Sequence, residues 1–299
     1  MGTNVRIVLY ARDAATADAL AAAAFARIAA LEDRFSDYRE SSELMALSRT
    51  AGGPPVAVSG DLFAVLSAAQ GFAERTGGAF DITIGPVSRM WRHARATGER
   101  PEAARLANAQ RLVGYRKMEL SAGPRTVRLR ERGMLLDLGG IAKGFAADEA
   151  LALLAGRGAR HAIVAIGGDV VAGDAPPGMR GWEIGVAPLG PGHGPSLPPA
   201  RLRFSAVSSS GDAEQFLDAG GEHFSHIVNP ITGSAATGRR GVTVLAPNGM
   251  TADALATAVK VLGAARGLKI VDGIEGAGAL VVEDTPEGVR EYRSKRWPR

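Results

Sequence analysis

The sequence predicts an α+β fold, in which strands at hairpin spacing and scattered helices occur without a regular strand-helix-strand alternation. Short runs of alternating apolar and polar residues give the strands, and apolar residues at helical spacing between them give the helices. Composition agrees: 299 residues with 46% hydrophobic content can form a sizeable core, whereas 39 glycines and 5% aromatics indicate many loops and small core side chains.

The chain begins with a predicted strand and a long predicted helix. Apolar residues alternate over Val5–Leu9, and Asp13 is a candidate N-cap for the helix that follows. The alanine-rich segment Ala14–Leu31 is interrupted by Asp18 and Arg27, so it is predicted to be an amphipathic helix and not a membrane span.

Two further helices and two strand-like runs are predicted before residue 134. Asp61 is the expected N-cap of a helix that the glycine pair Gly77-Gly78 ends. Pro101 opens a short helix that reaches Val113, and the two strand-like runs follow it.

A glycine-rich turn near the middle of the chain has the pattern of a phosphate site. Met134–Leu136 is an apolar run of strand type, and a helical pattern runs from Phe145 to Gly156. The turn between them contains Gly139, Gly140, Lys143 and Gly144. Glycine reaches backbone conformations closed to other residues, the helix start offers free N–H groups, and the lysine adds a charge. A plain strand-turn-helix connection remains open, because Gly-Gly before a helix is common.

The second half is predicted to add strands, one helix and a long loop. The expected strands are Ala162–Ile166, Trp182–Val186, Leu202–Val207, His223–Val228, Val242–Leu245 and Leu280–Val282, and the expected helix is Thr251–Leu262. Pro188–Pro199 is rich in proline and glycine, so a mobile loop with His193 exposed is expected. The order of strands, helices and strands occurs twice, before and after about residue 160, which suggests a duplication.

Charge and cysteine content exclude several classes of protein. The chain has no cysteine, which excludes disulfides, thiolate nucleophiles and cysteine metal sites. The net charge is +4, and apart from the final segment Arg290–Arg299 there is no long basic run. That segment is expected to be a solvated tail, and no nucleic-acid motif is found. The start of the sequence lacks the charged, apolar and cleavage regions of a signal peptide.

The stretch around the glycine turn, DLGGIAKGFAAD (Asp137–Asp148), resembles the signature loop of the FAD:protein FMN transferase (ApbE) family. Further segments resemble the family's motifs in the family's order: Met1-Gly2-Thr3, FSDYRESSEL from Phe35, GGAFDITIGP from Gly77, AIGGD from Ala165, SSSGD from Ser208, HIVNPITG from His226 and TADALATA from Thr251. Ordered matches over nearly the whole chain are specific, whereas any one of them would be weak.

The resemblance implies a fold and an activity. It implies antiparallel sheets with packed helices in a duplicated T-fold-like architecture, and a single domain over residues 1–299 whose two intertwined halves meet near residue 160. The implied reaction is Mg²⁺-dependent transfer of FMN from the substrate FAD to a threonine or serine hydroxyl of an acceptor flavoprotein, with release of AMP. Hydrolysis of FAD to FMN and AMP, and binding of FAD without turnover, remain alternatives.

Two oxygen side chains suggest a metal site. Asp253 and Thr257 stand four residues apart in the predicted helix, so their oxygens share one face a turn apart. Two hard oxygen donors suit Mg²⁺, although the same spacing also occurs on ordinary helix surfaces. The resemblance implies that these two side chains and the backbone carbonyl of Ala142 hold the ion.

The resemblance also implies catalytic residues. It assigns His226 as the base for the acceptor hydroxyl and Lys143 as a second catalytic residue, whereas a lone histidine at a strand end is by itself more often structural. Asn229 and Ile231 replace the aspartate and arginine that are usual in this motif, so charge support for the histidine is expected to be weaker.

The residues that the resemblance assigns to flavin binding come from several segments. They are Met1, Tyr38, Asp81, Gly139, Gly140, Lys143, Asp148, Gly168, Asp169, Ser210, Gly211, Asp212, His226 and Thr232. Tyr38 is expected to stack on an aromatic ring system. From the residues alone, a plain surface turn is favoured for the segments around Tyr38 and Ser210, and a turn that bonds its own backbone is an open alternative at Asp81.

The resemblance implies a location and a partner. Met-Gly-Thr usually lies inside the family's first strand, after an exported leader that is not present in this sequence. A periplasmic or cell-envelope protein is therefore expected, and a cytoplasmic location stays open. The expected partner is the acceptor flavoprotein, through which peripheral membrane contact is possible. No nucleic-acid partner is expected, and the oligomeric state is left open.

Overall fold

The computed structural model describes residues 3–186, 189, 197–203, 205–211, 216–219, 222–237, 239–285 and 287–298. Met1, His193 and Asp212 lie outside the described residues. The helices of the described part are α1 (Ala14–Phe35), α2 (Glu43–Arg49), α3 (Gly60–Thr76), α4 (Gly85–Thr97), α5 (Ala103–Gln110), α6 (Ala142–Gly156) and α7 (Gly249–Asp272), with 3₁₀ turns at Ile82–Ile84 and Tyr115–Lys117.

The strands form one large sheet and three small ones, and every pair in them is antiparallel. The seven-stranded sheet has the order β1 (Val5–Leu9), β5 (Ala162–Ile166), β6 (Asp169–Ala172), β9 (Ser205–Ser210), β13 (Arg239–Ala246), β14 (Gly278–Thr285) and β15 (Gly288–Arg293). The small sheets are β10 (Phe216–Ala219), β11 (Glu222–Val228) and β12 (Ala235–Thr237); β2 (Val56–Ala57), β4 (Thr126–Leu129) and β3 (Met118–Ser121); and β7 (Trp182–Ile184) with β8 (Ala200–Leu202). The predicted α+β fold with antiparallel sheets and packed helices is confirmed, whereas the division into two intertwined halves stays a prediction.

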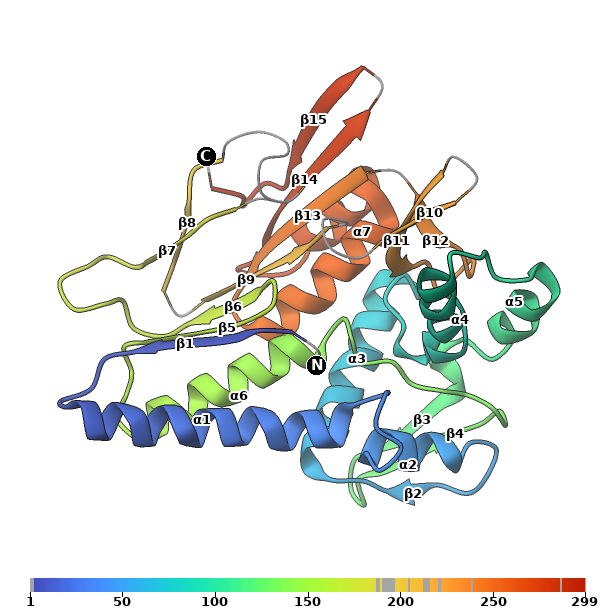
Figure 1. Cartoon of the computed structure of the whole chain (residues 1–299), viewed down its shortest axis with the longest axis horizontal. Coiled ribbons are helices and arrows are strands. Elements are labelled where there is room, and N and C mark those ends of the chain that lie inside the picture. The colour runs from blue at the N-terminus through green and yellow to red at the C-terminus, as the bar shows by residue number, and fades with distance from the viewer. Residues whose placement is uncertain are drawn as a thin grey trace.

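Helices cover the large sheet in layers (Figure 1). α6 and α7 pack on the sheet, and α1 lies along the outer side of α6. The buried residues of α1 follow helical spacing, as the sequence predicts: Leu20, Ala24, Ile28, Leu31 and Phe35. By length and composition α1 could cross a membrane. Its apolar stripe, however, belongs to the main core of the protein, with Phe35 and Phe145 in ring contact at 5.8 Å.

α6 and α7 cross at a point where their backbones touch. A Cβ atom on Gly144 would lie 2.2 Å from the carbonyl oxygen of Gly249, and one on Gly140 would lie 2.8 Å from Oγ1 of Thr257. Among the described residues, Gly139, Gly140 and Gly144 do not have a positive φ. The backbone freedom predicted for them is therefore not used, and these two positions require glycine for lack of space.

α4 joins the small β10-β11-β12 sheet to the rest of the fold. Its buried apolar residues are Val87, Trp91 and Ala94. The ring of Trp91 packs on Phe224 with a centroid distance of 5.3 Å, and its Nε1 donates to the carbonyl oxygen of Gly233 at 2.8 Å. This helix was not predicted, although Pro86 lies at its start and Gly98 ends it in the left-handed conformation.

Several predicted boundaries need correction. Asp13 caps α1 as predicted, with its side chain accepting from Thr16 N at 2.7 Å. Asp61, however, is not the N-cap of α3. Ser59 has that role, because its Oγ accepts from Leu62 N. Asp61 is the second residue of α3 and forms an ion pair with Arg27.

The other corrections concern strands and helix ends. Met134 and Leu136 are buried, but Met134–Leu136 forms no strand, because this segment has no ladder partner in the described part of the chain. The expected strand Leu202–Val207 divides between β8 and β9, and α7 continues past Leu262 to Asp272 with a break at Gly263. The basic segment expected as a solvated tail begins inside β15, which pairs with β14.

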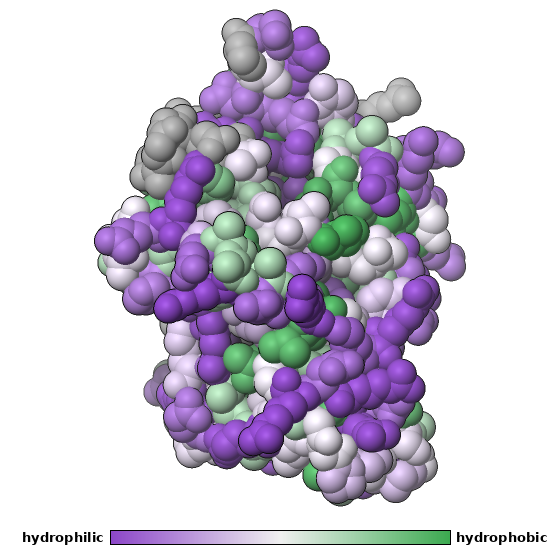
Figure 2. Space-filling view, turned by 90° about the vertical axis from the view of Figure 1, so that its right-hand side faces the viewer, coloured by the Kyte–Doolittle hydropathy of each residue, from purple (hydrophilic) through white to green (hydrophobic). Residues whose placement is uncertain are grey.

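The side of the molecule that carries α4 and α5 is largely hydrophilic. Figure 2 shows hydrophobic side chains on this side in separate patches between charged and polar ones. Large apolar side chains with more than 40% of their surface exposed are few among the described residues: Tyr10, Phe25, Tyr38, Met179, Phe216, Ile231 and Val289.

Candidate functional site

A cleft of about 780 Å³ opens where the large sheet, α4, α7 and the glycine turn meet. Its volume is in the range of small-molecule binding sites. The structure brings together at this cleft Tyr38, Asp81, Gly139, Gly140, Lys143, Gly168, Asp169, Ser210, Gly211, His226, Asp253 and Thr257. Most of the site residues predicted from the sequence therefore line one cavity, although they come from segments far apart in the chain.

Lys143 lies between two carboxylates in this cleft. Its Nζ is 3.0 Å from Oδ2 of Asp169 and 3.1 Å from Oδ1 of Asp253, and it donates to the carbonyl oxygen of Gly139 at 2.9 Å. Asp169 opens β6 and is 1% exposed, and Asp253 lies near the start of α7 and is 2% exposed. One ammonium group thus joins the sheet, α7 and the glycine turn.

The charges of this centre shift the pKa values of Asp253 and Lys143. Burial raises the pKa of Asp253 to about 7, with a further increase from the charge of Asp169 and an opposing decrease from Lys143. Burial alone would lower the pKa of Lys143, but the two carboxylates outweigh it and hold that pKa above its ordinary value. The lysine therefore stays charged. A strongly perturbed carboxylate with a specific charge partner in a cleft is typical of a functional site.

A carboxylate occupies the start of α6. The backbone N–H of Gly144 donates to Oδ2 of Asp253 at 3.1 Å. The prediction of free N–H groups at this helix start is therefore wrong for Gly144, because Asp253 takes the position that a phosphate would need. The N–H of Gly139 likewise donates to Oδ1 of Asp137 at 2.9 Å, so the turn offers a phosphate close approach at Gly140 and the charge of Lys143.

The side chains near the start of α7 fit a hard cation. Asp253 and Thr257 lie on one helix as predicted, and both line the cleft. Oδ2 of Asp169 forms the ion pair with Lys143 but has no hydrogen bond within the described residues. Two carboxylates and a hydroxyl suit Mg²⁺, which takes few protein ligands and fills its other positions with water or phosphate oxygens. Ala142, the third predicted ligand, starts α6 and lines a side pocket rather than the cleft itself.

Only two acidic side chains belong to this donor set. Among the residues that the structure describes, no group of three or more His, Cys, Asp or Glu side chains is placed to hold a metal ion. The donor set thus favours an ion that accepts water or ligand oxygens over one that needs a cage of protein side chains.

Asp81 is held in a turn of its own segment. Its Oδ1 accepts from Thr83 N at 2.8 Å, and its Oδ2 accepts from Tyr115 N at 2.7 Å. Burial raises the pKa of its carboxyl group. The turn that the sequence left open is thus present, and Asp81 nevertheless forms part of the cleft wall.

Asp148 and Thr232 do not line the cleft. The two carboxylate oxygens of Asp148 accept from the N–H groups of Gly249 and Met250 at 2.7 and 2.9 Å, so Asp148 fixes the start of α7 to α6. The cofactor contact of Asp148 stays a prediction, and in the structure its carboxylate bonds the backbone of α7. Burial raises the pKa of Asp148 to about 6. Thr232 is exposed in a turn, where its hydroxyl accepts from Ser234 N at 3.3 Å.

His226 lies on β11 and faces the cleft. The turn after this strand contains the two residues that depart from the family motif. Oδ1 of Asn229 accepts from Ile231 N at 2.9 Å, so the amide oxygen organises the turn. The side chain of Ile231 is 54% exposed.

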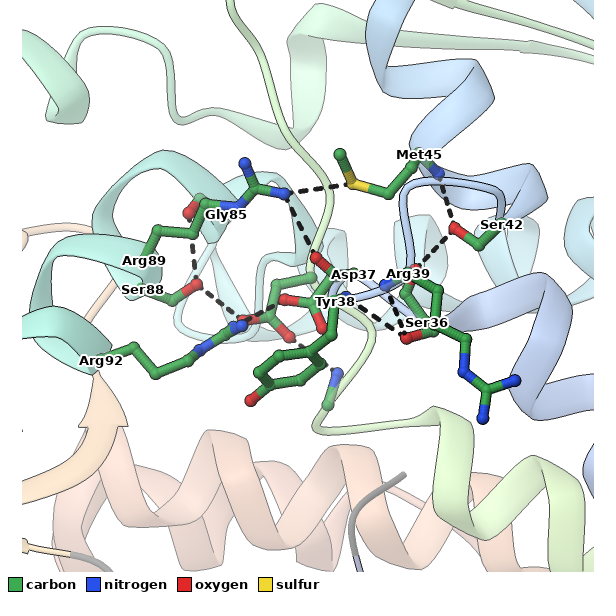
Figure 3. Close-up of polar contacts among 12 residues, drawn as sticks. Ser36, Asp37, Tyr38, Arg39, Ser42, Met45, Gly85, Ser88, Arg89 and Arg92 are labelled. Carbon is green, nitrogen blue, oxygen red and sulfur yellow. Dashed lines mark hydrogen bonds and ion pairs between the residues drawn. The ribbon is translucent and has the colours of Figure 1, made fainter. Parts of the chain in front are cut away.

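A charged cluster at the mouth of the cleft was not predicted (Figure 3). Nη2 of Arg92 donates to Oδ2 of Asp37 at 2.6 Å and to Oδ2 of Asp137 at 3.0 Å. The guanidinium carbon of Arg92 lies 4.3 Å from the ring centroid of Tyr38, which is 73% exposed. Arg95 lines the cleft one turn later on α4, and burial together with the charge of Arg92 lowers its pKa. Arg92 and Arg95 are three residues apart, a spacing that places them on one face of a helix. This spacing could have indicated the cluster, but α4 itself was not predicted.

A cleft in which buried carboxylates, a charged lysine and a glycine turn converge defines an α+β enzyme that acts on a polar ligand. Comparison with known proteins is more specific, because the sequence model of the ApbE family matches residues 1–281. The chain belongs to the ApbE family.

Individual relatives agree with this assignment. The FAD:protein FMN transferase of Treponema pallidum is 35% identical over 298 residues, which cover 94% of this chain and 82% of that protein. The FAD:protein FMN transferase of Haemophilus influenzae is 30% identical over 246 residues, which cover 80% of this chain and 71% of that protein.

Solved structures match the fold over nearly the whole chain. The flavin transferase ApbE from Vibrio cholerae has a TM-score of 0.84 and 28% identity and covers 99% of this chain and 94% of its own. The ApbE protein from Thermotoga maritima has a TM-score of 0.87 and 31% identity, with coverage of 98% and 94%. The family resemblance stated from the motifs is confirmed.

Proposed function

We propose that this chain is an FAD:protein FMN transferase, which moves FMN from FAD to a threonine or serine hydroxyl of an acceptor flavoprotein and releases AMP. The observation that carries the proposal is the Lys143–Asp169–Asp253 centre beside the Gly139-Gly140 turn. A pyrophosphate needs a nearby cation, close approach to the backbone and oxygen donors for a metal ion, and this part of the cleft offers all three. Membership of the ApbE family supports the same reaction.

The transfer step exchanges one phosphorus–oxygen bond for another. The acceptor hydroxyl oxygen bonds to the phosphorus of the FMN half of FAD, and the bond from that phosphorus to the bridging oxygen breaks. The electron pair of the broken bond leaves on the phosphate of AMP. His226 accepts the hydroxyl proton, and Lys143 offsets the negative charge of the phosphate oxygens. Tyr38 supplies an aromatic surface on which the flavin ring stacks.

Asp253 and Thr257 would hold Mg²⁺, with Asp169 as a neighbouring oxygen donor, and the resemblance adds the carbonyl of Ala142. Bound there, the ion would neutralise pyrophosphate charge and stabilise the leaving oxygen. The same two carboxylates keep Lys143 protonated, so the lysine remains a hydrogen-bond donor over the working pH range.

Incubation with FAD, Mg²⁺ and an acceptor domain tests this proposal. A fluorescent acceptor band on a denaturing gel, together with free AMP, is the expected result. Free FMN and AMP with an unmodified acceptor would instead show FAD hydrolysis. Bound but unchanged FAD would show a flavin-binding protein without turnover. The Asp253→Ala variant is the negative control, which should form no flavinylated acceptor, no FMN and no AMP.

The location of the protein belongs to the same proposal. The family's exported members support action in the periplasm or at the cell envelope, with peripheral membrane contact through the acceptor. Cell fractionation of the natural host, followed by detection of this chain, tests the location. Recovery in the cytoplasmic fraction alone would contradict it.

A further inference from the structure

One face of α4 ties two loops of the cleft together (Figure 3). Oγ of Ser88 donates to Oδ2 of Asp137 at 2.6 Å. One turn later, Nη2 of Arg92 donates to Oδ2 of Asp37 and to the same oxygen of Asp137. Arg89 donates to the backbone oxygen of Asp37 at 3.2 Å. Arg92 lies four residues after Ser88 and three after Arg89, so one side of the helix holds the loop at residue 37 against the loop at residue 137.

The central ion pairs differ from ordinary surface salt bridges. The side chains of Arg92, Asp37 and Asp137 are 23%, 13% and 16% exposed. Burial and the charge of Asp137 raise the pKa of Asp37, and Arg92 opposes this increase. Without the guanidinium, two largely buried carboxylates would face each other. Removing one partner of such a cluster is far more costly than removing one partner of an exposed pair.

Each of the two loops carries a residue of the flavin site. Tyr38 follows Asp37, and its largely exposed ring rests on the guanidinium of Arg92 in a cation–π contact. On the other loop, Oδ1 of Asp137 accepts from the N–H of Gly139 at 2.9 Å. Arg92 is therefore the shared contact between the tyrosine and the glycine turn that holds Lys143.

We propose that Arg92 is a positioning residue for FAD binding, which fixes the orientation of Tyr38 and the distance of Gly139 from it across the mouth of the cleft. The inference rests on the proposed function, because FAD is the ligand in question. It assigns Arg92 to the affinity for FAD rather than to the transfer step. A planar guanidinium is required, since it donates to two carboxylates and stacks on the ring at the same time, which an ammonium group does less well.

Equilibrium dialysis with FAD and Mg²⁺, without acceptor, tests the inference. Arg92→Ala should raise the Kd for FAD about 10- to 100-fold, the range found when a residue that orients a metal ligand is lost. Arg92→Lys should give an intermediate Kd. The kcat at saturating FAD should change much less than the Kd.

Arg27→Ala is the matched control. Arg27 also bridges two carboxylates, Asp61 and Glu149, and its side chain is also 23% exposed, but it does not line the cleft. Its loss should lower the melting temperature and leave the Kd unchanged. If Arg92→Ala does not fold, Arg92→Lys is compared with Arg27→Lys, and an equal Kd for that pair overturns the inference.

A second variant separates positioning from direct ligand contact. Asp37→Asn keeps the guanidinium but weakens its bond to the loop that carries Tyr38, so it should raise the Kd for FAD in the same direction as Arg92→Ala and by a smaller factor. An unchanged Kd in Asp37→Asn beside a raised Kd in Arg92→Ala would mean that Arg92 contacts FAD itself, which overturns the positioning role. If the parent protein binds no FAD, the proposed function fails. If the parent binds FAD and Arg92→Ala binds it equally well, only the positioning role fails.

Discussion

Lys143 sets the charge balance of the cleft at the scale of single residues. It lies within 3.1 Å of two buried carboxylates from β6 and α7. One positive charge between two carboxylates leaves a centre with a net negative charge, which attracts a further cation. The ammonium group of Lys143 can still donate a hydrogen bond to a phosphate. Under the proposed function, this combination would let one small centre bind both a metal ion and a pyrophosphate.

Asp253→Ala should abolish Mg²⁺-dependent turnover, because it removes the carboxylate donor on α7 and one partner of Lys143. Asp272→Ala, at the far end of the same helix, is the matched control and should keep the parent rate, since the side chain of Asp272 accepts from Lys295 N and does not line the cleft. Initial rates over a Mg²⁺ titration measure both. An Asp253→Ala rate and Mg²⁺ dependence equal to those of the parent would exclude the metal site.

His226→Ala should leave the affinity for FAD within a few-fold and slow transfer by roughly 10²- to 10⁴-fold, the usual effect of losing a positioned base. Asn229→Asp should not lower the rate, because an aspartate oxygen accepts the same hydrogen bond from Ile231 N. Single-turnover flavin transfer measures the rates. A His226→Ala protein as fast as the parent would make the histidine structural.

Asp148 should make stability depend on pH. Burial raises its pKa from 3.8 to about 6, so the folded state holds this proton more tightly than the unfolded state. Its contribution to the unfolding free energy is full below pH 4 and is lost as pH rises through 6. Relative to Asp148→Asn, the parent should lose up to about 3 kcal/mol between pH 4 and pH 7, since one pKa unit is about 1.4 kcal/mol.

Urea unfolding at several pH values measures this difference. Asp61→Asn is the control with the opposite sign, because hydrogen bonding to Arg27 lowers the pKa of Asp61. Relative to that variant, the parent should gain stability as pH rises from 3 to 5. A flat parent-minus-Asp148→Asn difference from pH 4 to pH 7 would contradict the role given to Asp148.

Individual site residues were predictable where a motif marks them, as with Lys143, Asp169 and Asp253. The Arg92 cluster had no such mark. Its partners lie 55 and 45 residues away along the chain, and pairing over that distance leaves no local pattern in the sequence. Asp148 shows the reverse case, since a motif position turned out to fix α7 rather than to line the cleft.

At the scale of elements, the crossing of α6 and α7 determines the shape of the site. The two helices touch through Gly144 and Gly249, and this contact brings Asp253 to the start of α6. Any side chain at the crossing would push the helices apart and separate Lys143 from its α7 partner.

Gly144→Ala should therefore destabilise the protein by about 1–3 kcal/mol or more, the usual cost of overpacking, and should also reduce transfer. Gly156→Ala, at the last residue of the same helix, is the matched control, because a Cβ there meets nothing within 4 Å. It should be neutral or stabilise by up to about 1 kcal/mol. Thermal unfolding measures both, and equal melting temperatures for the two variants would exclude a tight crossing.

Elements with a clear local signal were predicted with correct bounds, such as β1 and β5. The segment Met134–Leu136 has the same apolar character but forms no strand. Whether an extended run becomes a strand depends on a neighbour to pair with, and that neighbour is a property of the tertiary fold. β15 shows the converse, since its exposed residues carry little apolar pattern and pairing with β14 makes it a strand.

At the scale of the whole molecule, the fold works by bringing distant segments to one cleft. Lys143 and Asp253 are 110 residues apart in the sequence and meet through the packing of α6 on α7. Composition and periodicity gave the class of fold, but only the ordered motifs of the family indicated which segments converge. The order of strands in the large sheet could not be predicted, because it depends on crossover connections that local patterns do not encode.

The most direct test of the account is the intact mass of the acceptor after incubation with FAD and Mg²⁺, with AMP counted in the same sample. A flavin transferase should give a mass increase of one FMN on the acceptor and one AMP for each modified molecule, and neither product should form with Asp253→Ala. An acceptor of unchanged mass beside accumulating FMN and AMP, or no products at all from bound FAD, would contradict it.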